Sequence, residues 1–187
     1  MAELKTRIKF TYDDYKSLPG SETKRYELLG GELYMVPSPS FKHQLVSGNL
    51  ELLLRNFVAE NELGIILDAP FDVVFGEGEE REVVQPDIFF ISKERTGIIS
   101  EEEICGAPDL IVEIISPGTE ERDRGYKKTL YARHGVKEYW IVDPEAKTVE
   151  LFTLGEKGFE LVRAYKGTEV LKPPLLEGLE VDLKEVF

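Results

Sequence analysis

Residues 109–143 constrain the fold of this chain more than any other stretch. They begin with "DLIVEIISP", where apolar residues surround one carboxylate, Glu113, and they end with the apolar run "KEYWIVD". The residues between these runs predict a loop and then a helix that Thr119 caps and Gly135 ends. Two strands joined through one helix are typical of a βαβ crossover, so we expect a sheet with a helix packed on it.

Similar patterns place further elements on both sides of this crossover. Upstream, they predict a helix over 11–18, a β-hairpin that turns at Gly30-Gly31, and a long helix capped by Ser40. Strands follow in "GIILDA", "FDVVF" and "QPDIFFI", then a short helix over 97–105. Downstream, "TVELFTL" and "FELVRAY" predict a meander, and the tail predicts an edge strand and a last turn. The order indicates a mixed α/β (α+β) fold in a single domain, residues 1–187.

Charge and composition limit the function classes. The formal net charge of −13 argues against a surface that holds nucleic acid by general electrostatics. A local basic cleft, or a site where metal ions supply positive charge, stays open. No apolar run reaches the roughly 20 residues that span a bilayer, and the N-terminus lacks the apolar core of a signal peptide. The single cysteine excludes an intrachain disulfide. We therefore expect a cytoplasmic protein that is not bound to a membrane.

Two acids stand in or beside apolar strands, where a charge is expensive. Asp87 follows Pro86 at the start of "QPDIFFI", and Glu113 lies inside "DLIVEIIS". If these strands pair, both carboxylates can line one cleft, and oxygen ligands of this kind suit Mg²⁺ or Mn²⁺. Each acid also has a structural interpretation. Asp87 can satisfy a turn after the proline, and Glu113 can pair with Arg122, Arg124 or a lysine of the next helix.

Lysines and histidines supply the remaining candidates. Lys127 on the helix after Glu113 can swing toward the cleft and orient water or stabilise negative charge, whereas we expect Lys128 on a solvated face. His43, near the start of the long helix, can bind an anion, a metal or a proton in transit, or it is simply a polar helix residue. His134, at a helix end, has a structural interpretation in which an imidazolium stabilises the helix.

A resemblance to a known family rests on "QPDIFFI", on "APDLIVEIISPGTEERDRGYKKTLYARHGVKEYWIVDPEAKTVELF" and on the upstream "RYELLGGELYMVPSPSFKHQ". The chain resembles the Uma-type endonucleases, which look like members of the PD-(D/E)XK nuclease superfamily. The resemblance implies a restriction-endonuclease-like core, in which helices flank a central mixed β-sheet. It also implies Mg²⁺- or Mn²⁺-dependent hydrolysis of phosphodiester bonds in DNA, and a homodimer.

The family motif matches this chain at Asp87, Glu113, His43 and Lys127. Asp87 and Glu113 would be the metal ligands. The superfamily's usual E-x-K spacing puts a lysine two residues after the glutamate, on the same strand face. Here that position is Ile115, so Lys127 is the candidate cation. Glu32, in the hairpin, is a further candidate acid, or a strand-face residue near a turn.

Three functions stay open. The leading one is a metal-dependent nuclease acting on DNA, in which His43 assists at the metal or the phosphate. The second is a catalytically inactive scaffold or binding module with the nuclease fold, favoured by the charge of −13 and the missing E-x-K lysine. The third is a metal-dependent hydrolase of a small phosphorylated substrate.

Overall fold

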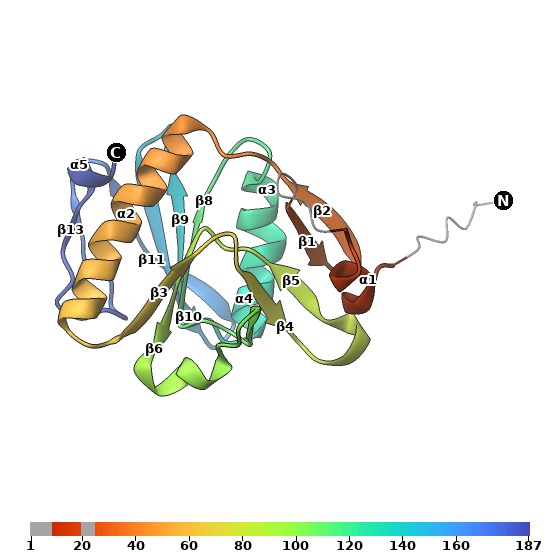
Figure 1. Ribbon diagram of the computed structural model, residues 1–187. Coiled ribbons are helices and arrows are strands. Elements are labelled where there is room, and N and C mark those ends of the chain that lie inside the picture. The colour runs from red at the N-terminus through yellow and green to blue at the C-terminus, as the bar shows by residue number, and fades with distance from the viewer. Residues whose placement is uncertain (1–8, 20–24) are drawn as a thin grey trace.

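A six-stranded mixed sheet forms the centre of the molecule (Figure 1). The computed structural model describes residues 9–19 and 25–187. The sheet has the order β11-β10-β9-β8-β6-β3, built from β3 (Gly64–Asp68), β6 (Ile88–Ser92), β8 (Leu110–Ile114), β9 (Glu138–Asp143), β10 (Thr148–Gly155) and β11 (Gly158–Lys166). Strands β8 and β9 are parallel, whereas β9, β10 and β11 are antiparallel neighbours. The predicted crossover and meander are therefore confirmed.

The crossover helix consists of three consecutive pieces. They are α3 (Glu120–Arg122), a π-helical turn (Asp123–Lys127) and α4 (Lys128–Arg133). The helix ends as predicted before Gly135. The φ of Gly135 is 85°, a left-handed conformation that favours glycine because glycine has no Cβ. The predicted cap at Thr119 is wrong in its chemistry, because the hydroxyl of Thr119 accepts from the backbone N–H of Ser116 instead of from the helix. A π-helical turn is wider than an α-helical one and often occurs at functional sites.

A second, five-stranded sheet has the order β2-β1-β5-β4-β7. Its strands are β1 (Arg25–Leu29), β2 (Glu32–Val36), β4 (Asp72–Phe75), β5 (Glu82–Val84) and β7 (Glu103–Cys105). The hairpin prediction is confirmed, since β1 and β2 are antiparallel and join through Gly30 (φ 58°) and Gly31 (φ 81°). Positive φ at both positions is the requirement of a type I′ turn.

The short helix predicted over 97–105 is wrong. A 3₁₀ helix covers Lys93–Ile98, and Glu103–Cys105 forms strand β7, which pairs in parallel with β4. The reason is a period of two: Ile104 is fully buried, while Glu103 and Cys105 on either side of it are not. Burying one side chain in three at the edge of a sheet suits a strand.

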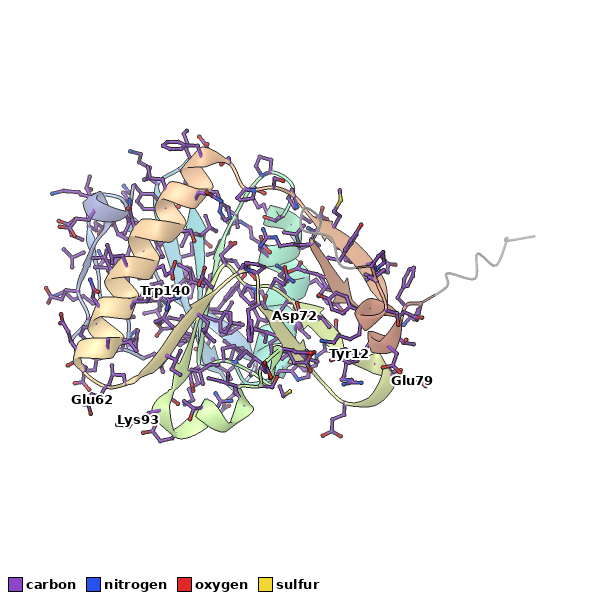
Figure 2. The ribbon with its side chains drawn as sticks, viewed as in Figure 1. Tyr12, Glu62, Asp72, Glu79, Lys93 and Trp140 are labelled. Atoms are coloured by element: carbon purple, nitrogen blue, oxygen red, sulfur yellow. The ribbon has the colours of Figure 1, made fainter. Side chains whose placement is uncertain are left out.

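Helices cover both faces of the six-stranded sheet. Helix α2 (Phe41–Glu60) begins at Ser40, as predicted, with the Ser40 hydroxyl accepting from the N–H of His43 at 3.2 Å. Its buried residues Val46, Leu50, Leu54 and Val58 pack in one cluster with Trp140 of β9 (Figure 2). On the opposite face, Leu130 and Tyr131 of α4 pack in a cluster drawn from both sheets. Figure 1 shows the crossover helix between the two sheets.

The remaining elements are short. Helix α1 (Tyr12–Lys16) has the capping box predicted from Thr11 and Asp14. A single 3₁₀ turn, Gly78–Glu80, lies in the acidic loop between β4 and β5. In the tail, β13 (Val181–Asp182) pairs with β12 (Val170–Leu171) in a separate two-stranded sheet, and α5 (Leu183–Val186) follows. Every helix in the described ranges is too short or too polar to span a bilayer.

Candidate active site

Asp87 and Glu113 lie side by side on neighbouring strands. Strands β6 and β8 are antiparallel with Ile88 opposite Val112, so the next pair along the ladder is Asp87 and Glu113. Directly opposed residues of an antiparallel pair point to the same face. The carboxylate of Asp87 also accepts the backbone N–H of Ile114 at 2.8 Å, which ties the start of β6 to the end of β8. The expectation that these strands pair and bring the two acids together is confirmed.

Lys127 completes a buried cluster with three carboxylates. Its Nζ lies 2.8 Å from Glu27 Oε1, 3.1 Å from Glu113 Oε1 and 3.2 Å from Asp123 Oδ1. The side chain of Lys127 is only 5% exposed. This geometry fits a buried ion pair with a lysine of the next helix, and it equally places the ammonium beside a candidate metal ligand. Both interpretations from the sequence therefore describe the same contact.

Ile115 explains why the lysine comes from a helix. Its side chain is buried in the apolar cluster between the two sheets, where an ammonium would lose its hydration. The π-helical turn instead carries Asp123 and Lys127, four residues apart, with both side chains buried. The ammonium that contacts Glu113 therefore comes from the crossover helix packed on the sheet, and not from strand β8 itself.

The charges of this cluster decide how its members are protonated. Burial alone would lower the pKa of Lys127, but attraction to Glu113, Glu27 and Asp123 outweighs it and holds that pKa well above its usual value. The lysine is therefore an ammonium that donates hydrogen bonds, not a base. Tyr131 donates from its hydroxyl to Glu113 Oε1 at 2.5 Å. Burial, and then the charge of Glu113, raise the pKa of Tyr131, so this phenol stays protonated.

Positive charge is scarce inside the buried cluster of Glu27, Glu113, Asp123 and Lys127. Burial is the main cause that raises the pKa of Glu113, the charges of Asp123, Asp87 and Glu27 add to it, and Lys127 offsets only part of the effect. Burial likewise raises the pKa of Asp123. Asp123 Oδ1 is near the ammonium but receives no well-directed hydrogen bond from a described residue. One lysine shared among three carboxylates leaves the cluster short of positive charge.

His43 contacts Asp87 from the first turn of α2. Its Nε2 lies 3.2 Å from Asp87 Oδ2, and its side chain is 15% exposed. Burial opposes protonation of the imidazole, but the hydrogen bond and charge of Asp87 raise the pKa of His43 overall. The N-terminus of α2, which Ser40 caps, therefore places the partly buried imidazole of His43 against Asp87.

These groups line one cavity of about 370 Å³. Its wall includes the segment that links β2 to α2 and the turn that follows β8. The candidates Asp87, Glu113, Lys127 and His43 all line it, as do Glu27 and Asp123. The structure thus brings together all four side chains singled out from the sequence; their catalytic roles stay predictions.

Other candidates lie elsewhere. Glu32 is outside the lining of the cavity and accepts a hydrogen bond from Tyr34 at 2.8 Å. Lys128, expected on a solvated face, is half-buried, and its Nζ lies 3.6 Å from the ring centroid of Phe152. The expected imidazolium at His134 is wrong, because burial, and then the charge of Arg133, lower the pKa of that histidine. The neutral ring of His134 packs 5.0 Å from that of Phe75.

Glu27 and Asp123 are the site residues that sequence reasoning missed. Glu27 lies in β1 beside buried Leu28 and Leu29 and is 2% exposed, which is the signal that singled out Glu113. The hairpin acid chosen from the sequence was Glu32 instead. Asp123 stands four residues before Lys127, a spacing at which helical side chains contact each other. The sequence therefore holds a local signal for each acid, namely a glutamate beside apolar residues and an i, i+4 spacing, but not the contact between the sheets that brings Glu27 to Lys127.

The donor set fits a divalent ion with oxygen ligands. Asp87 Oδ1 and Glu113 Oε2 accept no hydrogen bond from the residues that the structure describes. In those ranges, no group of three His, Cys, Asp or Glu side chains could enclose a metal ion. Mg²⁺ commonly binds through one or two carboxylates and keeps several waters, so two acids on adjacent strands match its needs. Zn²⁺, which takes three or four protein ligands, fits less well.

Comparisons with known proteins identify the family and the fold of the chain. A family model, Uma2, described as "Putative restriction endonuclease", matches residues 12–184. An uncharacterized protein of Synechocystis sp., slr1290, is 24% identical over 167 residues, which cover 88% of this chain and 84% of that protein. A crystal structure described as "a putative nuclease belonging to DUF820", from Anabaena variabilis, superimposes with a TM-score of 0.78 at 21% identity, covering 95% of this chain and 97% of the other. This structural match shows a shared fold, and the family match over most of the chain shows that this protein belongs to the Uma2 family of restriction-endonuclease-like proteins.

Proposed function

We propose that this protein is a metal-dependent endonuclease that hydrolyses phosphodiester bonds in DNA. One observation carries the proposal: Asp87 and Glu113 share a cavity with a buried ammonium, Lys127, and a partly buried imidazole, His43. Structural ion pairs do not need an open cavity, whereas a substrate phosphate and its metal ion do. Membership of a family described as restriction endonucleases supports the same reaction.

Asp87 and Glu113 would hold Mg²⁺ or Mn²⁺. When bound, such an ion activates a water molecule and stabilises charge on the phosphoryl group. The shortage of positive charge around Glu113 supports this assignment, because a divalent cation would supply what one lysine cannot.

The chain's own residues would orient the reactants. Lys127 is held rigidly by Glu27 and Asp123, so its ammonium can donate to the attacking water or to the charged phosphate at a fixed position. Tyr131 would fix the carboxylate of Glu113 through its 2.5 Å hydrogen bond. His43 would orient Asp87 and donate a proton toward the substrate, since Asp87 favours the imidazolium form.

An inactive scaffold or binding module is the second candidate. The net charge of −13 and the complete burial of Lys127 in ion pairs favour it. In that case the cluster only joins β1, β8 and the crossover helix. It would then bind nucleic acid or protein without any requirement for a metal. A homodimer that cuts both strands and a cytoplasmic location stay predictions of the nuclease proposal.

A cleavage assay separates these candidates. Supercoiled plasmid and single-stranded DNA are incubated with Mg²⁺, with Mn²⁺ and with EDTA, and products are resolved on gels. We expect cleavage that EDTA abolishes and that Asp87→Asn reduces by at least about 100-fold. Equal activity in Asp87→Asn and in the parent would refute the proposed site.

A matched pair of lysine variants tests the ammonium. Lys127→Met should remove cleavage, whereas Lys128→Met, one residue on and directed at Phe152, should stay within about twofold of the parent. Thermal unfolding of both variants with and without Mn²⁺ reports whether they are folded. Similar losses of cleavage in two folded variants would mean that Lys127 has no special role.

A further inference from the structure

Two arginines differ from the other arginines of the described chain. Six of the eight arginines in residues 9–19 and 25–187 form ion pairs, namely Arg55, Arg81, Arg95, Arg124, Arg133 and Arg163. Arg25 and Arg122 form none with a described residue, although acids outnumber bases in this chain by 36 to 23. Both of these arginines line the cavity that holds Asp87 and Glu113. Guanidinium groups that stay unpaired in so acidic a protein, at one place, indicate an anionic ligand.

Arg122 is held in a position from which it can donate. Its guanidinium carbon lies 4.9 Å from the centroid of the Tyr34 ring, which supports the planar group. Its Nε is buried and has no hydrogen-bond acceptor among the described residues. A buried donor without an acceptor is costly, and an anionic ligand in the cavity would satisfy it.

Arg25 lies where the cavity meets a second hollow. It is the first residue of β1 and, at a spacing of two, shares a strand face with Glu27. Arg25, His43 and Asp87 line both the main cavity and an adjoining groove of about 220 Å³ beside α2. Gln44 and Ser47 add polar groups along this groove.

The acids of the groove are already compensated. Glu51 and Asp68 line it, and Arg55 pairs with both of them. The guanidinium of Arg25 is therefore not needed to neutralise its own groove. Arg25, which lines both the cavity and the groove, can therefore donate hydrogen bonds to a polyanion that passes between them.

We propose that Arg25 and Arg122 bind the phosphates on either side of the cleaved one, and that the DNA strand leaves the cavity through the groove beside α2. This inference rests on the proposed nuclease function. Arg122 takes the phosphate on the side of Tyr34, and Arg25 takes the phosphate on the side of the groove. The planar fork of arginine suits bidentate binding of phosphate.

The test measures binding apart from cleavage. Fluorescence anisotropy gives the affinity for a labelled single-stranded oligodeoxynucleotide, with Ca²⁺ in place of Mg²⁺, at several salt concentrations. Arg25→Gln and Arg122→Gln should each weaken binding by about tenfold to hundredfold. Each should also reduce the slope of log affinity against log salt by about 0.7, the value for one lost phosphate contact on a single strand. Arg163→Gln, which breaks an exposed ion pair at the edge strand β11, is the matched control and should change neither quantity.

Two further measurements keep this inference separate from the nuclease proposal. Calorimetry should show that both variants bind Mn²⁺ as the parent does, because neither arginine is a metal ligand. Arg122→Lys keeps the charge and should keep the salt slope while losing affinity, which tests the position if Arg122→Gln fails to fold. Arginine-dependent binding in a protein that never cleaves DNA would support the assignment of Arg25 and Arg122 as phosphate contacts and refute the nuclease proposal. Unchanged affinity and slope in Arg25→Gln and in a folded Arg122 variant would overturn the inference, even if the parent cleaves.

Discussion

Asp109 and Glu113 are buried carboxylates at opposite ends of strand β8, and they have opposite surroundings. Asp109 is 0% exposed and Glu113 is 3% exposed. Asp109 receives Lys137 Nζ at 2.8 Å, the Ser92 N–H at 2.8 Å and Arg95 Nη1 at 2.9 Å. Burial would raise the pKa of Asp109, but these three donors outweigh it and lower that pKa. Glu113 shares one lysine with two other acids, and its pKa is raised.

A third buried acid lies between these extremes. Glu138, at the start of β9, accepts the indole N–H of Trp140 at 2.8 Å and the N–H of Leu175 at 3.1 Å. Both donors are neutral, so burial prevails and raises the pKa of Glu138 to about 6. The three acids differ in how far positive charge compensates their burial, and of the three only Glu113 lines the cavity with Asp87. We propose that this combination of burial, little positive charge and an adjacent cavity marks a metal ligand.

The largest effect is expected at Glu113. Glu113→Gln should reduce DNA cleavage by about 10³-fold, equivalent to about 4 kcal/mol of transition-state stabilisation, because a metal ligand is lost. Its free energy of unfolding should stay within about 1 kcal/mol of the parent or rise, since a poorly compensated charge is removed. Cleavage kinetics and urea denaturation check both parts. A severe loss of stability would instead class Glu113 with Asp109.

The next effect concerns the other end of the strand. Asp109→Asn should lower the free energy of unfolding at neutral pH by about 2 to 3 kcal/mol, because it removes the charge that Arg95 and Lys137 bind. Because the pKa of Asp109 is lowered in the folded state, its ionised carboxylate stabilises the fold above the usual aspartate pKa. This stabilisation is lost as the pH falls through the pKa that Asp109 has in the folded state. The stability difference between parent and variant should therefore shrink in acid. A difference that does not depend on pH would show that the ion pairs are not its source.

The smallest effect belongs to Glu138. Because its folded pKa of about 6 exceeds the usual 4.5, the folded state holds the proton more tightly. Stability from this group is full below about pH 4.5 and falls by about 2 kcal/mol as the pH rises to about 6. Glu138→Gln should remove this part of the pH dependence. Denaturation of parent and variant across pH 4 to 7 measures it, and parallel curves would show that Glu138 titrates normally.

Local patterns predicted most of the fold. The glycine pair at 30–31, the serine cap of α2 and the two apolar runs around the crossover each determine nearby backbone, and all three are confirmed. The second sheet was not predicted, because its strands come from segments far apart in the chain and pair through contacts that no local period encodes. The error at 97–105 has the same origin, since β7 exists only beside β4. That the chain is a single domain stays a prediction.

The site was predicted in part, for a related reason. Pairing of two apolar strands was enough to bring Asp87 to Glu113. Lys127 and His43 were predicted from their places on the flanking helices, and the resemblance matched both of them. Glu27 reaches the cluster from the other sheet, which sequence periodicity could not place. The π-helical turn that turns Asp123 inward depends on packing between the sheets and has no simple sequence signal.

Calorimetric titration with Mn²⁺ distinguishes a metal ligand at Glu113 from a structural ion pair at Asp109. Parent, Glu113→Gln and Asp109→Asn are compared at neutral pH, well below the unfolding temperature of each. We expect the parent and Asp109→Asn to bind Mn²⁺ with similar affinity and Glu113→Gln to give no binding heat. Binding of Mn²⁺ by a folded Glu113→Gln variant with the affinity of the parent would show that Glu113 is not a metal ligand.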